Sequence, residues 1–252
     1  MLRSGNPVLN DETFSTRNLS RTTYGDDSNV MTLHGTVNKT LLLLLAIMVS
    51  ATYTWNLFFE GRTEVMGPIM IGGAIGGFVL GLVTTFKKNW APITAPFYAV
   101  FEGLFLGALS ATVETRYPGI VIQAVGLTFA VFLALLFAYK SQLIQATENF
   151  KLGLSAAMGG IFLLYLAQFV LSMFGVHIPY IHESGVIGIG FSLVVVVVAA
   201  LSLVMNFDFI ENGASTGAPK YMEWYSAFAL MVTLIWLYIE MLHLLMKLNN
   251  RR

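Results

Sequence analysis

The sequence predicts an all-α integral membrane protein with seven transmembrane helices and a soluble N-terminal arm. The chain of 252 residues is 56% hydrophobic and only 11% charged, whereas soluble domains carry about 25% charged residues. Apolar stretches of about 20 residues, the length that crosses the bilayer core as a helix, recur along the chain. These stretches do not alternate polar and apolar residues, as the strands of a membrane β-barrel do.

The chain divides into two parts. Residues 1–36 are rich in Asn, Thr, Ser, Asp and Arg, and we interpret them as a polar cytoplasmic arm. They do not resemble a cleaved signal peptide, because the first apolar run begins only near Thr40 and is too long. Residues 37–252 form the transmembrane domain. Its predicted spans are Thr40–Phe59, Met66–Phe86, Ala91–Val113, Ile120–Tyr139, Leu152–Phe174, Gly185–Met205 and Tyr225–Leu248.

Glycines in the second and third spans indicate close helix packing. They recur at small-xxx-small spacing, which lets two helix backbones approach closely inside a bundle. The glycines concerned are Gly72, Gly73, Gly76, Gly77, Gly81, Gly103 and Gly107.

The charges indicate an orientation and exclude several functions. Lys and Arg are more numerous in the N-terminal arm and the connections on its side than on the opposite side, which favours a cytoplasmic N-terminus. A formal net charge of zero argues against nucleic-acid binding, which needs a basic face. The absence of cysteine excludes disulfides, thiol catalysis and zinc–thiolate sites. Sequence motifs of soluble enzymes are also absent, so we expect no enzymatic activity and no bound cofactor.

Three acidic residues lie within or at the end of predicted spans: Glu102, Asp208 and Glu240. Ionisable groups are costly in a membrane, so each is a functional hypothesis. No Lys or Arg lies deep in a predicted span, so we expect these acids to have no buried basic partner. They are then protonated, hydrated, or share protons or cations with one another.

The sequence leaves the pairing of these acids open. At 1.5 Å per residue, Glu102 lies about 16 Å and Glu240 about 22 Å from the cytoplasmic side. This depth favours a Glu102–Glu240 pair, whereas an Asp208–Glu240 pair requires the seventh helix to begin outside the hydrocarbon. In a simpler alternative, Asp208 and Glu211 end the sixth helix in water, and the other two acids hydrogen-bond neighbouring helices. His243 shares a helix face with Glu240.

Five segments of the chain resemble the transmembrane Bax-inhibitor-motif family, and most closely its bacterial Bax-inhibitor-like branch. The resemblance covers nearly the whole chain and is most specific in its last three segments. The segments are residues 6–10 (NPVLN), 95–103 (APFYAVFEG), 206–211 (NFDFIE), 218–225 (APKYMEWY) and 236–245 (WLYIEMLHLL).

This resemblance implies a bundle whose last helix is central and a pH-sensitive calcium leak across the bacterial inner membrane. Its sensor is a pair of acids on the sixth and seventh helices, which correspond to Asp208 and Glu240 and bind Ca²⁺ transiently. The seventh-helix acid is Glu here, where the family has Asp. Glu102, Glu211 and His243 complete the expected ion- and pH-sensing set.

The expected partners are the lipid bilayer, Ca²⁺ and protons, and the chain is expected to be a monomer. The alternative function is a non-conducting regulator that acts through membrane-protein partners in stress or quality control.

Overall fold

The computed structural model describes residues 29–175 and 185–251. Within these ranges, seven helices are long and apolar enough to cross a membrane, which confirms the all-α membrane fold. Most of the predicted N-terminal arm, including residues 6–10, lies outside the described residues. The helices are α2 (Leu33–Phe59), α3 (Met66–Phe86), α4 (Ala91–Arg116), α5 (Ile120–Lys140), α6 (Glu148–Met173), α7 (Val186–Ser215) and α8 (Met222–Asn249), with short 3₁₀ turns at Thr63–Val65 and Lys88–Trp90.

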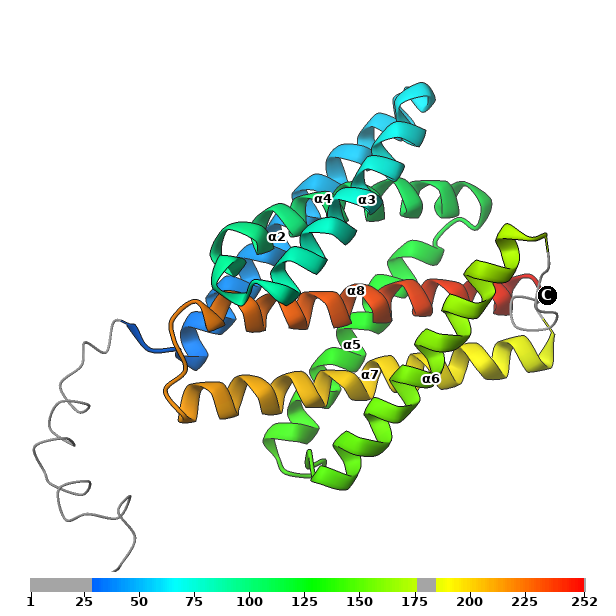
Figure 1. Cartoon of the computed structure of the whole chain (residues 1–252). Helices are drawn as coiled ribbons and strands as arrows, with labels where there is room; N and C mark the ends of the chain where they lie inside the picture. The colour runs from blue at the N-terminus through cyan, green and yellow to red at the C-terminus, as the bar shows by residue number, and fades with distance from the viewer. Residues whose placement is uncertain (1–28, 176–184, 252) are drawn as a thin grey trace, which may run out of the picture.

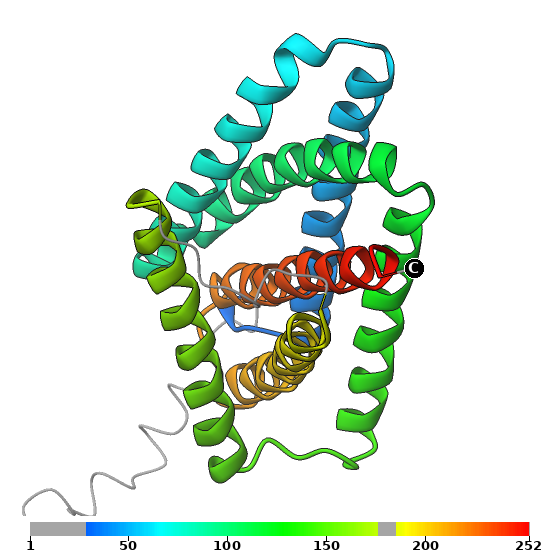
Figure 2. The same ribbon diagram turned by 90° about the vertical axis from the view of Figure 1, so that its right-hand side faces the viewer.

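The last helix, α8, is the centre of the bundle (Figures 1 and 2). It packs against α2, α4, α5 and α7, while α3 packs mainly on α4, and α6 mainly on α7. Most of α8 is buried, and Leu237 and Leu242 are almost completely covered. The central position of the last helix is therefore confirmed.

Consecutive helices run in opposite directions, so the bundle has two ends. We call the end that holds the starts of α2, α4, α6 and α8 the first end, and the opposite end the second end. The first end carries the turns after α3, α5 and α7, and the second end carries those after α2 and α4.

The helices extend beyond the apolar runs that predict them. α2 begins at Leu33 instead of Thr40, and Thr32 caps it by accepting a hydrogen bond from the Gly35 amide at 3.0 Å. α7 continues past Met205 to Ser215. The additional turns are polar because they lie at the ends of the spans, where hydropathy no longer marks a helix. Asp208 and Glu211 are therefore inside α7 and do not follow its end.

The predicted close packing through glycine is confirmed. A methyl group on Gly73 or Gly77 would press on α4, and one on Gly103 or Gly107 would overlap the backbone of α2. Gly72, in contrast, faces open space. Three helices, α2, α3 and α4, are thus joined by glycine contacts into one closely packed unit.

Candidate functional site

Glu240 is an acid buried in the membrane domain. Its side chain projects from α8 and the residue is only 4% exposed. The carboxylate accepts a hydrogen bond from the Tyr165 hydroxyl on α6 at 2.9 Å and one from Trp236 Nε1 at 3.3 Å. His243 Nδ1 lies 3.8 Å from Glu240 Oε2, so the two share a helix face as their spacing indicates. The closest groups to the Glu240 carboxylate are thus two neutral donors and a titratable imidazole, and Lys247 lies within its electrostatic reach.

Glu240 lines a cavity of about 600 Å³ at the second end of the bundle. Lys247 closes one side of it by donating to Ser192 Oγ at 2.8 Å and to the Gly188 carbonyl at 3.1 Å. His243 also lines this cavity, and its side chain is half exposed. Its other polar lining residues are Thr112, Arg116, Tyr117, Tyr165 and Asn250.

Asp208 forms an ion pair that was not expected. Lys151 Nζ on α6 lies 2.8 Å from Asp208 Oδ2 and 3.2 Å from Glu148 Oε1. Asp208 therefore has a basic partner at the end of its span, where the Lys151 side chain is 30% exposed, and not the buried basic partner that the prediction excluded. The reason is that α6 begins at Glu148 instead of Leu152, which places Lys151 on the helix, opposite α7.

Glu211 also joins α7 to a neighbouring helix. The Tyr139 hydroxyl at the end of α5 donates to Glu211 Oε2 at 2.6 Å. Both acids are thus bonded to side chains of other helices, although Glu211 is exposed.

Glu102 belongs to a different part of the bundle. It is half-buried on α4, accepts a hydrogen bond from Tyr98 one turn earlier, and lies against Gly77 of α3. The missing side chain at Gly77 makes room for this carboxylate.

The structure does not pair Asp208 with Glu240. Asn206 Nδ2 donates to Thr233 Oγ1 at 2.7 Å, and this contact fixes the antiparallel register of α7 and α8. In that register Asp208 is level with Met231, which is about 13 Å along the helix from Glu240. Calcium–oxygen bonds are only about 2.3–2.6 Å long, so one Ca²⁺ cannot bind both carboxylates in this arrangement.

Glu102 and Glu240 are not paired either. The hydroxyls of Ser110 and Tyr238 are 2.7 Å apart, which sets the parallel register of α4 and α8. Glu102 is consequently roughly 15 Å short of the level of Glu240. The depth estimate was wrong because α8 begins at Met222, before the predicted Tyr225, so that Glu240 lies further from the first end.

The two predicted sensor acids, Asp208 and Glu240, do not contact each other, but both are bonded to side chains of α6. Lys151 and Tyr165, their partners, are about 21 Å apart along that helix. α6 is otherwise loosely packed, and Leu154 is its only buried residue. Between the two acids, the Ser202 hydroxyl of α7 lies 3.2 Å from Met158 Sδ of α6. Asp208 and Glu240 thus contact α6 at two separate levels, with the Ser202–Met158 contact between them.

A fourth acid, Glu223, was not predicted as a site residue. It is fully buried at the start of α8. Glu223 accepts hydrogen bonds from the Thr32 amide at 2.8 Å and the Thr32 hydroxyl at 2.9 Å. It also forms ion pairs with Lys39 and with Lys220, the latter at 3.1 Å. We call these four residues the Glu223 clasp.

The clasp lies where the segment before α2 meets the α7–α8 connection. The Met31 amide donates to the Ala218 carbonyl at 2.8 Å, and the Lys220 amide donates to the Asn29 carbonyl at 2.9 Å. The only sequence signal for the clasp is the spacing of Lys220 and Glu223, because its other members come from the opposite end of the chain.

The part of the chain that the structure describes contains no group of three or more His, Asp or Glu side chains that could hold a metal ion. The acids are therefore arranged as separate sites along the bundle.

Comparison with known proteins identifies the family. The family described as Bax inhibitor 1 like matches residues 6–250, almost the whole chain. Comparisons with curated proteins and with solved structures gave no match. The chain therefore belongs to the Bax inhibitor 1 like family of multi-pass membrane proteins.

Proposed function

We propose that this protein is a pH-sensitive cation leak that conducts Ca²⁺ and is gated by protonation of Asp208 and Glu240. The observation that carries the proposal is the attachment of both acids to α6, through Lys151 and Tyr165. The loosest described helix of the bundle is thereby held by two carboxyl groups, each of which a proton can neutralise.

Protonation would release this attachment. A protonated Asp208 no longer attracts the Lys151 ammonium, and a protonated Glu240 accepts a weaker hydrogen bond from Tyr165. Both changes loosen α6 relative to α7 and α8 and favour an open form. We therefore expect flux to be larger at pH 6 than at pH 8.

Other charged and titratable groups surround each acid. Glu148 on α6 faces the Asp208 pair, and Tyr139 on α5 lies within its electrostatic reach. Around Glu240 the corresponding groups are Arg116, Tyr117, Tyr165, His243 and Lys247.

Polar side chains lie at several levels along α7 and α8. The Glu240 cavity opens at the second end, and Asp208 lies toward the first end. The hydrogen-bonded side chains of Asn206 and Thr233 lie between them.

The proposal is tested by Ca²⁺ flux into proteoliposomes at pH 6 and pH 8. The proteins compared are the wild type, Asp208→Asn and Glu240→Gln, with Glu60→Gln as the matched control because the Glu60 side chain is 61% exposed. We expect flux to depend on pH in the wild type and the control, and this dependence to be flattened in the other two.

Two results would contradict the proposal. One is an unchanged pH dependence in both Asp208→Asn and Glu240→Gln. The other is no flux above that of empty vesicles from protein shown to be folded, which would favour the non-conducting regulator.

A further inference from the structure

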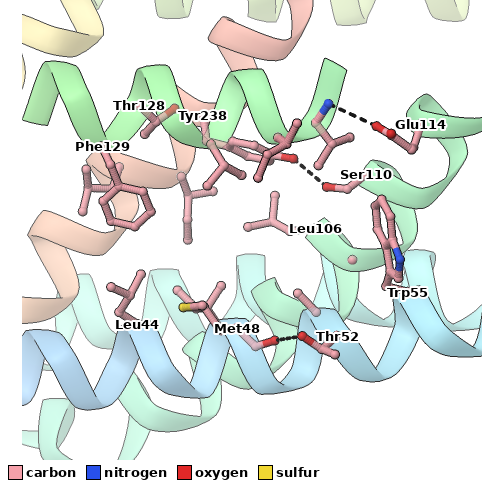
Figure 3. A pocket seen from close by; sticks show the side chains of 18 of the residues that line it. Leu44, Met48, Thr52, Trp55, Leu106, Ser110, Glu114, Thr128, Phe129 and Tyr238 are labelled. Atoms are coloured by element: carbon pink, nitrogen blue, oxygen red, sulfur yellow. Dashed lines mark hydrogen bonds between the residues drawn. The ribbon is translucent and has the colours of Figure 1, made fainter. Parts of the chain in front are cut away.

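A second cavity, of about 640 Å³, lies between α2, α4, α5 and α8 (Figure 3). Its size is within the range of small-molecule sites, which is about 300–1,000 Å³. Side chains of α2 and α5 face each other across it, and α4 and α8 form its floor. Its apolar lining includes Leu44, Met48, Leu106, Val125, Phe129 and Leu234.

The cavity opens sideways, toward the hydrocarbon of the membrane. α2 and α5 both pack on α8 but hardly touch each other. In Figure 2, α2 passes behind α4 and α8, while α5 lies apart from it at the right. Two lining side chains at the opening, Met48 and Ile122, are 55% and 71% exposed. Both are apolar, so the opening suits lipid tails and not water.

The polar atoms in the wall already have partners. The hydroxyls of Ser110 and Tyr238 bond each other at 2.7 Å. Those of Thr52 and Thr128 donate to carbonyls of their own helices, each at 2.7 Å. Glu114 accepts from backbone amides at the start of α5. Since these groups are satisfied, most of the wall acts as an apolar surface and favours a hydrocarbon ligand.

The cavity also has the length of one bilayer leaflet. Its lining on α2 runs from Leu44 to Asn56, which is about 18 Å along the helix. One leaflet contributes half of a hydrocarbon core of about 30 Å. Asn56 and Trp55 belong to the last turns of α2, and tryptophan is enriched at the membrane–water interface. The cavity thus extends from the interface at the second end to the middle of the membrane.

We propose that this cavity binds one acyl chain of a phospholipid from the leaflet at the second end. The ester region of the lipid lies beside Trp55 and Asn56, and the chain end reaches Leu44 and Phe129. The bound chain fills the gap between α2 and α5 and contacts α8. The site does not include Asp208 or Glu240, so it stands independently of the proposed cation leak.

The first test is photo-crosslinking of the wild-type protein in vesicles. One phospholipid carries a diazirine at the end of an acyl chain, and a second carries it near the ester. We expect adducts of the first near Leu44, Thr128 and Phe129, and adducts of the second near Trp55 and Asn56. A cavity free of adducts, or adducts spread evenly over exposed faces such as Phe162 and Phe169 of α6, would overturn the proposal.

The second test fills the cavity. Val125→Phe places a ring in the space, and Val170→Phe on the exposed face of α6 is the matched control. We expect Val125→Phe to lower the yield of cavity adducts several-fold and to retain about one phospholipid fewer per chain, with the control unchanged. If folded Val125→Phe protein gives the same yield of cavity adducts as the wild type, the proposal is overturned. If this variant does not fold, the wild-type adduct map decides.

Discussion

Lys151 of α6 and Asp208 of α7 form an ion pair with 2.8 Å between Nζ and Oδ2. This contact fastens the first turns of α6 to the bundle, while Tyr165 fastens the same helix to Glu240 further along. A proton sensor assembled in this way does not require its two carboxylates to meet. It requires that each be bonded to the same loosely packed helix.

Lys151→Met should therefore reproduce the effect of acid. With no ammonium at this position, Asp208 cannot hold α6, whatever its own charge. We expect Ca²⁺ flux at pH 8 to rise toward the wild-type value at pH 6, with a smaller difference between the two conditions. Lys140→Met is the control because Lys140 is exposed at the end of α5. If the Ca²⁺ flux of Lys151→Met depends on pH as that of the wild type does, the Lys151–Asp208 ion pair does not gate the flux.

α6 should also move relative to α2 when the pH falls. The chain has no cysteine, so paired spin labels can be attached at exposed positions without background. We expect the distance distribution between labels at Leu163 of α6 and Val49 of α2 to broaden between pH 8 and pH 5. A pair at Val49 and Ile75 of α3 should stay constant, since α2 and α3 are joined through the glycine contacts with α4. Identical distributions for the α6 pair at both pH values would exclude this movement.

The sequence predicts the helices well because one physical quantity, the length of uninterrupted apolar residues, determines which segments cross a bilayer. It predicts their ends poorly. The first turns of α6, with Lys151, and the last turns of α7, with Asp208, are polar and lie where the membrane ends. Hydropathy assigns them to loops, although their backbones continue the helix.

The sequence identifies the acids of the site but not their partners. Burial cost singles out Glu102 and Glu240 as functional groups. Which side chains they meet depends on the register between helices, which no local pattern encodes. The Glu223 clasp shows this most clearly, because Thr32 and Lys39 contact an acid almost 200 residues later in the chain.

Glu223→Gln should destabilise the fold. The substitution keeps an acceptor for Thr32 but removes the buried charge that pairs with Lys39 and Lys220. Breaking a fully buried ion pair costs about 3–5 kcal/mol, and the cost here is smaller because the Lys39 and Lys220 side chains are 17% and 42% exposed. We expect a clearly lower melting temperature in detergent, followed by tryptophan fluorescence, to which Trp224 contributes beside Lys39. Glu60→Gln, at an exposed position, should melt with the wild type. Equal melting of the two variants would mean that the clasp adds no net stability.

Gly107→Ala should weaken the contact between α2 and α4. The new methyl group would overlap the backbone of Ala51, which cannot turn aside as a flexible side chain could. Forcing extra volume into a packed interface costs about 1–3 kcal/mol.

Gly126→Ala on α5 is the matched control because nothing lies within 4 Å of its added carbon. Alanine also favours a helix over glycine by about 1 kcal/mol, so the control should melt at or above the wild-type temperature. The two variants make the same chemical change, so their difference in melting temperature measures the close approach of the helices alone. If both variants melt together, the glycine at position 107 is not needed for that approach.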